Sequence, residues 1–204
     1  MQAARGASLS DDDDTIDTSQ PTPSRSESSR LRLVFAAVAL TAYAVDLVTK
    51  HLAVTRLADG DVPVLGDWFV LHLTRNPGAA FSTGTEYTLV LSWLAVVAVC
   101  VVLWFSRRLG DRWWAVGLGL LLGGVAGNLT DRIFREPGPM RGHVIDLFML
   151  PSWPVFNIAD ICINAAAGVI LLQTFRGIGV DGRRVGSDDE PEAAATDDAQ
   201  AGEQ

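Results

Sequence analysis

The stretch HVIDLFMLPSWPVFNIADICIN, residues 143–164, places two carboxylates in apolar surroundings. Asp146 follows an apolar approach, and Asp160 lies fourteen residues later in a second apolar run that continues as AAAGVILLQTF. This second run predicts a membrane-spanning helix. A charged side chain at the centre of such a helix costs at least about 2.5–3.5 kcal/mol, which makes both aspartates candidate functional residues.

Four apolar runs in the chain have the length of a membrane span. The two middle runs contain no charged residue over nineteen and eighteen positions, and the fourth contains only Asp160. At a rise of about 1.5 Å per residue, roughly twenty helical residues cross the hydrocarbon core of a bilayer. We therefore predict an all-α membrane protein with four transmembrane helices, near residues 33–52, 87–105, 113–130 and 156–175.

The two ends of the chain are acidic, whereas the apolar part is nearly neutral. The formal net charge is −8, and hydrophobic residues make up 49% of the sequence. Residues 1–30 contribute −3 and residues 177–204 contribute −6, so residues 31–176 carry +1. Segments of low hydrophobicity and like charge have nothing to bury. We predict disordered acidic tails at 1–30 and 177–204 around a transmembrane domain at 31–176.

Basic residues are distributed unequally between the two sides of the predicted bundle. Ten lie on the side of both termini, including Arg107, Arg108 and Arg112 in the turn between the second and third spans. Six lie on the opposite side. Because cytoplasmic loops carry an excess of Lys and Arg, we expect both termini in the cytoplasm.

The segment between the first two predicted spans, residues 53–86, has a different character. It contains VPVLGDWFVLHLTRN, in which Val, Leu, Trp and Phe surround a Gly–Asp break. This pattern predicts a small amphipathic β-rich segment on the membrane surface. On the predicted topology it lies on the outer face, together with residues 131–155 and the polar ends of the spans. We therefore expect the chemistry at that face.

Asp146 and Asp160 cannot lie on one helix, because Pro151 and Pro154 separate them. The chain is expected to turn at Pro154 and enter the fourth span near Phe156, which lets Asp146 fold back to face Asp160. Two carboxylates a few ångströms apart share a proton, so one can activate water while the other acts as a general acid. Their spacing is equally compatible with two separate structural carboxylates, each paired with a basic residue.

Further polar side chains lie near the ends of the predicted spans. Two sets share a helix face, namely Asn157, Asp160 and Asn164 on the fourth span and Asn128, Asp131 and Arg132 on the third. In hydrocarbon such groups must face polar partners. They either surround the aspartates functionally or form a stripe of hydrogen bonds that holds the bundle together. Arg132 is suited to binding a peptide carbonyl or a lipid phosphate, or it pairs with Asp131.

Two other motifs contain polar groups. Asp46 and Lys50 stand at i and i+4 with the acid first, the favourable order for a helix pair, and we interpret them as a structural ion pair. In TRNPGAAF, residues 74–81, Asn76 supplies an amide and Gly78 a flexible backbone. This motif is either a clamp for an extended peptide or a turn.

Other chemistries lack their sequence motifs. The chain has no H-E-x-x-H or Cys/His cluster, no G-x-S-x-G and no phosphate-binding loop, and its histidines occur singly. A basic patch suited to nucleic acid is also missing. We therefore expect no metal, no cofactor and no nucleic-acid partner.

Together these motifs resemble the lipoprotein signal peptidase family, also called signal peptidase II. The resemblance covers essentially all of residues 33–175 and leaves out only the tails. Five motifs in the family's order on a four-span frame make it specific. The matching segments are D-x-x-x-K at 46–50, R-N-P-G-A-A-F at 75–81, G-N-L-x-D-R at 127–132, V-I-D at 144–146 and F-N-x-A-D at 156–160.

The resemblance implies an intramembrane aspartic endopeptidase that removes signal peptides from diacylglyceryl-modified prolipoproteins by cleaving before the lipidated cysteine. It implies that Asp146 and Asp160 are the catalytic dyad. Residues expected to bind substrate or support the dyad are Asn76, Gly78, Asn128, Arg132 and Asn157. We expect a monomer among the lipids of the bacterial cytoplasmic membrane, with its active site toward the outer face.

Two other classes of protein could use the same residues. One is a small transporter or proton relay that employs the carboxylates together with Asp46 and Lys50. The other is a helical scaffold whose polar stripes only join helices. A relay would spread its polar residues through the membrane depth, whereas here they gather toward one face.

Overall fold

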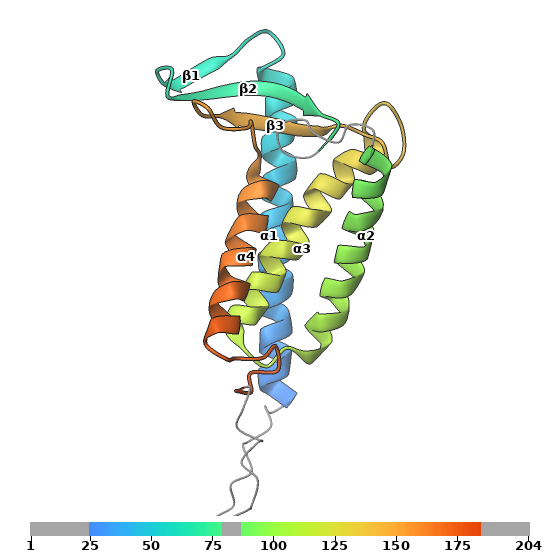
Figure 1. Ribbon diagram of the computed structural model, residues 1–204, viewed down its shortest axis with the longest axis vertical. Coiled ribbons are helices and arrows are strands. Elements are labelled where there is room, and N and C mark those ends of the chain that lie inside the picture. Colours follow the sequence, from blue (N-terminus) through green and yellow to red (C-terminus); the bar gives the residue numbers. More distant parts are fainter. Residues whose placement is uncertain (1–24, 79–86, 185–204) are drawn as a thin grey trace, which may run out of the picture.

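The computed structural model describes residues 25–78 and 87–184. The sequences predicted as disordered tails fall mostly outside the described residues, as does the end of the TRNPGAAF motif. Within the described part of the chain, four α-helices form a bundle and three strands form a sheet over one end of it (Figure 1). We call this the sheet end of the bundle.

The helices follow the four predicted spans. They are α1 (Arg25–Arg56), α2 (Thr88–Phe105), α3 (Arg112–Phe134) and α4 (Ile158–Phe175), with a 3₁₀ turn η3 (Ser106–Arg108) between α2 and α3. All four are long and apolar enough to cross a membrane. Large apolar side chains cover their outer surfaces, and Leu33 and Phe175 are 70% and 85% exposed. Such an exterior suits lipid, and the predicted spans are confirmed in their length and composition.

Ordered structure extends beyond residues 31–176 at both ends. α1 begins at Arg25, so residues 25–30, which the sequence assigned to the tail, form its first turns. The hydropathy pattern marks only the apolar part of a helix and misses polar turns that continue it into water. Beyond α4, residues 177–184 form turns at the end opposite the sheet, where the amide of Gly110 donates to the carbonyl of Val180 at 2.9 Å.

α3 is the central helix of the bundle and packs closely against both α1 and α4 (Figure 1). Glycines allow this approach. A Cβ atom at Gly123 would lie 2.6 Å from the carbonyl oxygen of Ala39 in α1. One at Gly124 would lie 2.6 Å from the carbonyl oxygen of Ala159 in α4. Small residues thus bring three backbones together, as is usual where membrane helices pack.

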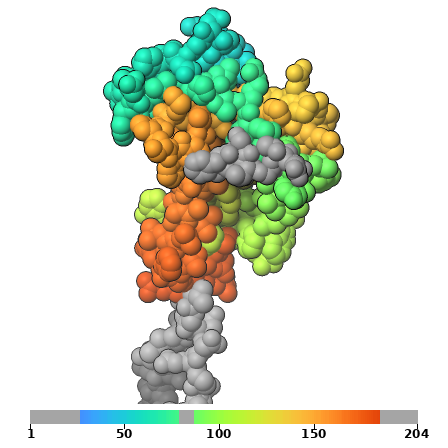
Figure 2. All heavy atoms as spheres, turned by 45° about the horizontal axis from the view of Figure 1, so that its top comes forward, coloured from blue at the N-terminus to red at the C-terminus, as the bar shows by residue number. Residues whose placement is uncertain are grey.

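The sheet is antiparallel, with strand order β1–β2–β3. β1 (Val62–Leu65) and β2 (Phe69–Asn76) form the β-rich segment that the sequence predicts. β3 (Val144–Met149) was not predicted, because its pairing with β2 joins residues about seventy positions apart. Figure 2 shows the three strands and the loop after α3 gathered at the same end of the molecule.

The register of β2 and β3 determines which side chains share a face of the sheet. Thr74 pairs with Asp146, Arg75 with Ile145, and Asn76 with Val144. Because successive side chains in a strand point to opposite faces, Asn76 and Asp146 lie on one face. Arg75 and Ile145 lie on the other.

An apolar cluster fixes β3 to the bundle. Ala53 and Leu57 near the end of α1 pack with Ile145 and Leu147 of β3, and all four are at least 93% buried. Burying such side chains stabilises the contact by roughly 1.5–3 kcal/mol for each large one. The strand that carries Asp146 is therefore held against the end of the helices.

Candidate active site

A pocket of about 460 Å³ opens at the sheet end and contains both predicted aspartates. Four of the five predicted supporting residues and the neighbouring Asn164 line it as well, whereas Asn157 lies behind the pocket wall. Its lining residues are Asn76, Gly78, Asn128, Arg132, Val144, Asp146, Trp153, Pro154, Val155, Asp160 and Asn164. The chain segments that meet here come from β2, α3, β3, the Pro-rich turn and α4. The structure thus brings Asp146 and Asp160 together, as the sequence predicts.

Asp146 lies on β3 and is 3% exposed. Two side-chain amides hold its two carboxylate oxygens: Asn157 Nδ2 donates to Oδ1 at 2.7 Å and Asn76 Nδ2 donates to Oδ2 at 3.0 Å. Burial raises the pKa of Asp146 to about 6, and the nearby charge of Asp160 adds to the rise, while the two amide hydrogen bonds oppose it. Asp146 is therefore a carboxyl group that can hold a proton near neutral pH.

Asp160 lies in the first turn of α4, where Asn157 is the residue that caps the helix. The Asn157 side chain accepts from the Asp160 amide at 2.9 Å, and Asp160 Oδ2 accepts from the Asn157 amide at 3.1 Å. This reciprocal capping box fixes the orientation of the carboxylate. Its other oxygen, Oδ1, accepts from Asn128 Nδ2 at 3.0 Å.

Asn157 connects the two aspartates. Its side-chain amide donates to Asp146 while its side-chain oxygen accepts from Asp160. The same NH₂ group lies 3.3 Å from the carbonyl oxygen of Ile145 and 3.2 Å from Asn128 Oδ1. Asn157 is fully buried, so these contacts satisfy a polar group that would otherwise be costly.

A fully buried ion-pair network lies beneath the pocket. Lys50 Nζ is 2.7 Å from Asp46 Oδ2 and 3.0 Å from Asp131 Oδ2. It also donates to Asn128 Oδ1 at 2.8 Å, which orients the Asn128 amide toward Asp160. The predicted Asp46–Lys50 pair is present, but the structure joins it to the site through Asn128.

Asp46 and Asp131 have further partners that tie the helices to the sheet. Asp46 Oδ1 accepts from the Ala159 amide at 2.9 Å, so a side chain of α1 caps the start of α4. Asp131 accepts from the Ile145 amide at 3.2 Å and forms an ion pair with Arg135. The sequence interpretation treated Asp131 only as a possible partner of an arginine. Its contacts with Lys50 and β3 depend on tertiary packing, so local spacing does not reveal them.

Arg132 and Gly78 meet at the edge of the pocket. Arg132 donates to the carbonyl oxygen of Gly78 at 2.7 Å and lies 3.5 Å from that of Pro77. The Gly78 amide in turn donates to Asn76 Oδ1 at 3.0 Å. The Asn76 side chain thus spans from this turn to Asp146, and Arg132 holds the turn in place. Asn164, also on the pocket wall, donates to the Asp160 carbonyl at 2.8 Å and does not contact either carboxylate by a hydrogen bond.

The described residues contain no group of three or more His, Cys, Asp or Glu side chains arranged to bind a metal ion. The pocket instead offers two oriented carboxylates, amide groups and a guanidinium. Such a pair is suited to activating water and transferring protons at a peptide bond.

Solved structures with a similar fold are membrane enzymes. One, described as a bacterial membrane enzyme determined by the in meso method at 2.3 Å, superposes with a TM-score of 0.61 at 19% identity, covering 81% of this chain and 94% of the other. A second, at 1.9 Å, superposes with a TM-score of 0.58 at 21% identity, covering 72% of this chain and 94% of the other. The four-helix fold with its small sheet is thus shared with known membrane enzymes.

Curated relatives show higher sequence identity. The lipoprotein signal peptidase of Mycolicibacterium smegmatis is 48% identical over 174 residues, covering 82% of this chain and 73% of the relative. That of Mycobacterium avium is 51% identical over 158 residues, covering 77% and 85%. That of Leifsonia xyli is 48% identical over 168 residues, covering 81% and 78%.

Paired carboxylates at one end of a membrane-spanning bundle are the arrangement that a membrane aspartic peptidase requires. The model of the signal peptidase (SPase) II family matches residues 38–176, which is most of the chain. The protein therefore belongs to the signal peptidase II family and is a bacterial membrane protein. The resemblance noted from the five motifs is confirmed.

Proposed function

We propose that Asp146 and Asp160 are the catalytic dyad with which this protein removes signal peptides from diacylglyceryl-modified prolipoproteins, cleaving before the lipidated cysteine. Signal-peptide removal is the activity of the family to which the chain belongs. The observation that carries the residue assignment is that both carboxylates line one pocket, each oriented by its own amide donors.

The reaction follows from the different surroundings of the two acids. We assign the single proton of the active dyad to Asp146, because burial raises its pKa to about 6. Asp160 acts as general base on a water molecule between the carboxyl groups, and that water attacks the scissile carbonyl carbon. Asp146 protonates the carbonyl oxygen, which gives a tetrahedral gem-diol intermediate. When the C–N bond breaks, the proton taken up by Asp160 passes to the leaving amine, and one hydroxyl of the gem-diol returns its proton to Asp146 as the new carboxyl group forms. After release of the products, the dyad again holds one proton.

The surrounding polar residues position the dyad and the peptide. Asn157 and Asn76 hold Asp146, while Asn128 holds Asp160 and takes its own orientation from Lys50. We propose that Asn76, Gly78 and Arg132 form one wall along which the extended substrate lies.

The apolar core of the bundle argues against the proton-relay alternative. Below the site, a buried cluster formed by Phe35, Val102, Leu109, Ala115 and Leu118 occupies the interior toward the opposite end. A relay would need polar side chains through this depth. The concentration of polar groups at the sheet end instead suits a reaction at one membrane surface.

We further propose the placement of the molecule in the membrane. The ten basic residues on the side of both termini favour the cytoplasm for that side, so the sheet and the pocket face outward. In this orientation a prolipoprotein presents its cleavage site to the pocket while its diacylglyceryl chains remain in the bilayer. We propose that the enzyme acts as a monomer, because both aspartates and their amide partners come from one chain.

The dyad assignment is tested with Asp146→Asn and Asp160→Asn, assayed separately for cleavage of a lipidated precursor in detergent. Each variant should lose at least about a hundredfold in turnover, the lower range for loss of a general acid or base. Asp67→Asn changes an exposed aspartate in the turn between β1 and β2 and should retain activity. Wild-type turnover in either dyad variant would refute the assignment.

A further inference from the structure

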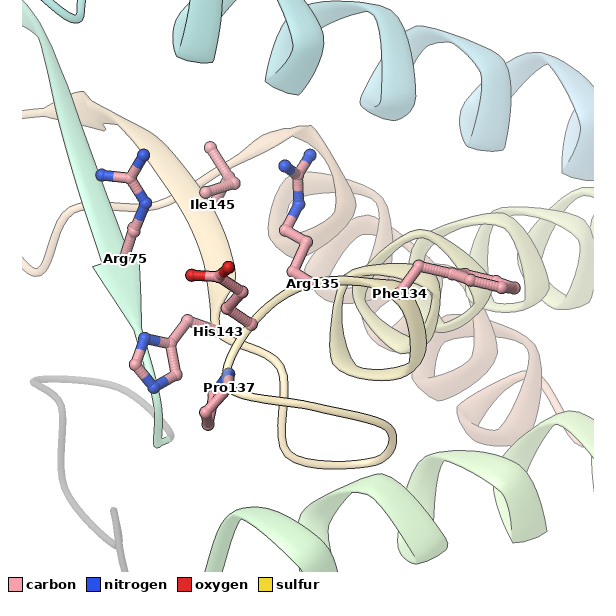
Figure 3. A pocket seen from close by; sticks show the side chains of 7 residues that line it. Arg75, Phe134, Arg135, Pro137, His143 and Ile145 are labelled. Atoms are coloured by element: carbon pink, nitrogen blue, oxygen red, sulfur yellow. The ribbon is translucent and has the colours of Figure 1, made fainter.

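A second pocket of about 510 Å³ lies at the sheet end, beside the loop that follows α3 (Figure 3). Its lining contains Arg75 of β2, Arg135 and Glu136 after α3, and His143 and Ile145 at the start of β3. Figure 3 shows Ile145 between the two arginine side chains, with His143 below Arg75. None of these side chains has a role in the proposed peptide cleavage.

The pleat of the sheet separates this pocket from the active site. Arg75 and Ile145 are paired across β2 and β3, whereas their chain neighbours Asn76 and Asp146 line the catalytic pocket. Because neighbouring residues of a strand point to opposite faces, the two pockets lie on opposite sides of the same pair of strands. The second pocket is thus a separate site.

The polar groups of the second pocket are suited to a phosphate ester. The Arg75 side chain is exposed and forms no ion pair within the described residues. Arg135 uses its Nε in the ion pair with Asp131, which leaves its terminal nitrogens for another anion. Two guanidinium groups and an imidazole therefore surround one space, and guanidinium groups bind phosphate oxygens in pairs.

A lipid is favoured as the source of the phosphate by the position of Phe134. This residue ends α3, the last turn of a helix able to cross the membrane, and it lines the pocket although it is 81% exposed. In Figure 3 its ring points away from the polar side chains. An exposed apolar ring at the end of a membrane-spanning helix is removed from water when lipid chains cover it. The pocket therefore combines polar groups for a headgroup with an apolar exit for acyl chains.

We propose that this pocket binds the headgroup of a phospholipid, with its phosphodiester between Arg75, Arg135 and His143. Glu136 accepts a hydrogen bond from the hydroxyl or ammonium group of the headgroup alcohol, and the acyl chains pass along Phe134. The diacylglyceryl group of a prolipoprotein carries no phosphate, so this ligand is a different lipid from the substrate. The proposal does not depend on the assignment of the catalytic dyad.

The test measures lipid retained by the purified full-length protein in native mass spectrometry. Dioleoyl phosphatidylglycerol and phosphatidylethanolamine are titrated as phospholipids, dioleoylglycerol as a lipid without phosphate, and glycerol 3-phosphate as a phosphate without chains. Wild type should bind one phospholipid more tightly than either control compound. Arg75→Gln should weaken phospholipid binding about tenfold, as expected for loss of one charge-assisted hydrogen bond, and Arg75→Lys should weaken it less.

Arg141→Gln is the matched control. Arg141 is an exposed arginine of the loop that follows α3, and its side chain does not line the pocket. It should bind like wild type, and thermal unfolding should show that both glutamine variants are folded. Equal binding by Arg75→Gln and wild type would overturn the proposal. Equal binding of dioleoylglycerol would exclude a phosphate site, and binding of glycerol 3-phosphate as tight as that of the phospholipids would exclude a lipid site.

Discussion

At the scale of single residues, the carboxyl group of Asp146 links the chemistry of the site to the stability of the fold. Burial raises its pKa from 3.8 to about 6. The folded protein therefore binds this proton more tightly than the unfolded chain. The resulting stabilisation is complete below about pH 3.8 and is lost as the pH rises through about 6.

Asp146→Asn should remove this pH dependence. At about 1.4 kcal/mol for each pH unit between the two pKa values, the stability of the variant relative to wild type should increase by about 3 kcal/mol between pH 3.5 and 7. The measurement is the thermal unfolding midpoint of both proteins in one detergent across this pH range. Parallel curves would show that Asp146 titrates in the folded protein as it does in the unfolded chain.

The individual residues of the site could be predicted only in part. Asp146, Asp160, Asn128 and Asn157 were recognisable because a polar side chain in an apolar run needs a partner. The sequence could not pair each amide with its aspartate, and it gave Asp131 only a minor role. Those contacts depend on how α1, α3 and β3 meet, which local spacing does not encode.

At the scale of the helices, the close approach of α3 to α1 depends on Gly123. An added Cβ would lie 2.6 Å from the carbonyl oxygen of Ala39 and 2.7 Å from the Cβ atom of Ala42. Backbone cannot move away as a flexible side chain can. Gly123→Ala should therefore lower the free energy of unfolding by about 1–3 kcal/mol, the usual cost of overpacking.

Gly168→Ala provides the matched comparison, because a Cβ at Gly168 of α4 would meet nothing within 4 Å. Replacing a helical glycine by alanine at an open position should raise stability by up to about 1 kcal/mol. Thermal unfolding in the same detergent compares the two variants. Opposite shifts of the unfolding midpoint are expected, and equal shifts would show that the α1–α3 contact is looser than the structure indicates.

The helices were more predictable than the strands for a physical reason. Hydropathy over about twenty residues is a local property, so all four spans were found. The β1–β2 hairpin is also local, because its strands follow one another. β3 was missed because α2 and α3 lie between it and β2 in the chain, so its pairing is not a local property of the sequence.

At the scale of the whole molecule, the proposed orientation can be tested by labelling introduced cysteines. In a background with Cys100 and Cys162 replaced by alanine, Arg141→Cys lies at the sheet end and Arg107→Cys lies in the turn between α2 and α3. A membrane-impermeant maleimide added to intact cells, with any outer envelope made permeable, should label the first position. The second should react only after the inner membrane is opened, and the reverse pattern would invert the proposed topology.

Side chains alternate between the two faces of β2 and β3, and this alternation also affects how the sequence of such a protein can diverge. Side chains at 144 and 146 contact the catalytic pocket, and those at 143 and 145 contact the second one. Because Ile145 is also packed in the buried cluster against α1, His143 is the position next to β3 where a substitution can adapt the second pocket to the lipids of the host, while selection for peptide cleavage acts on 144 and 146. An insertion of one residue would exchange the two sets, so length changes in this strand should be purged even where side-chain changes are tolerated.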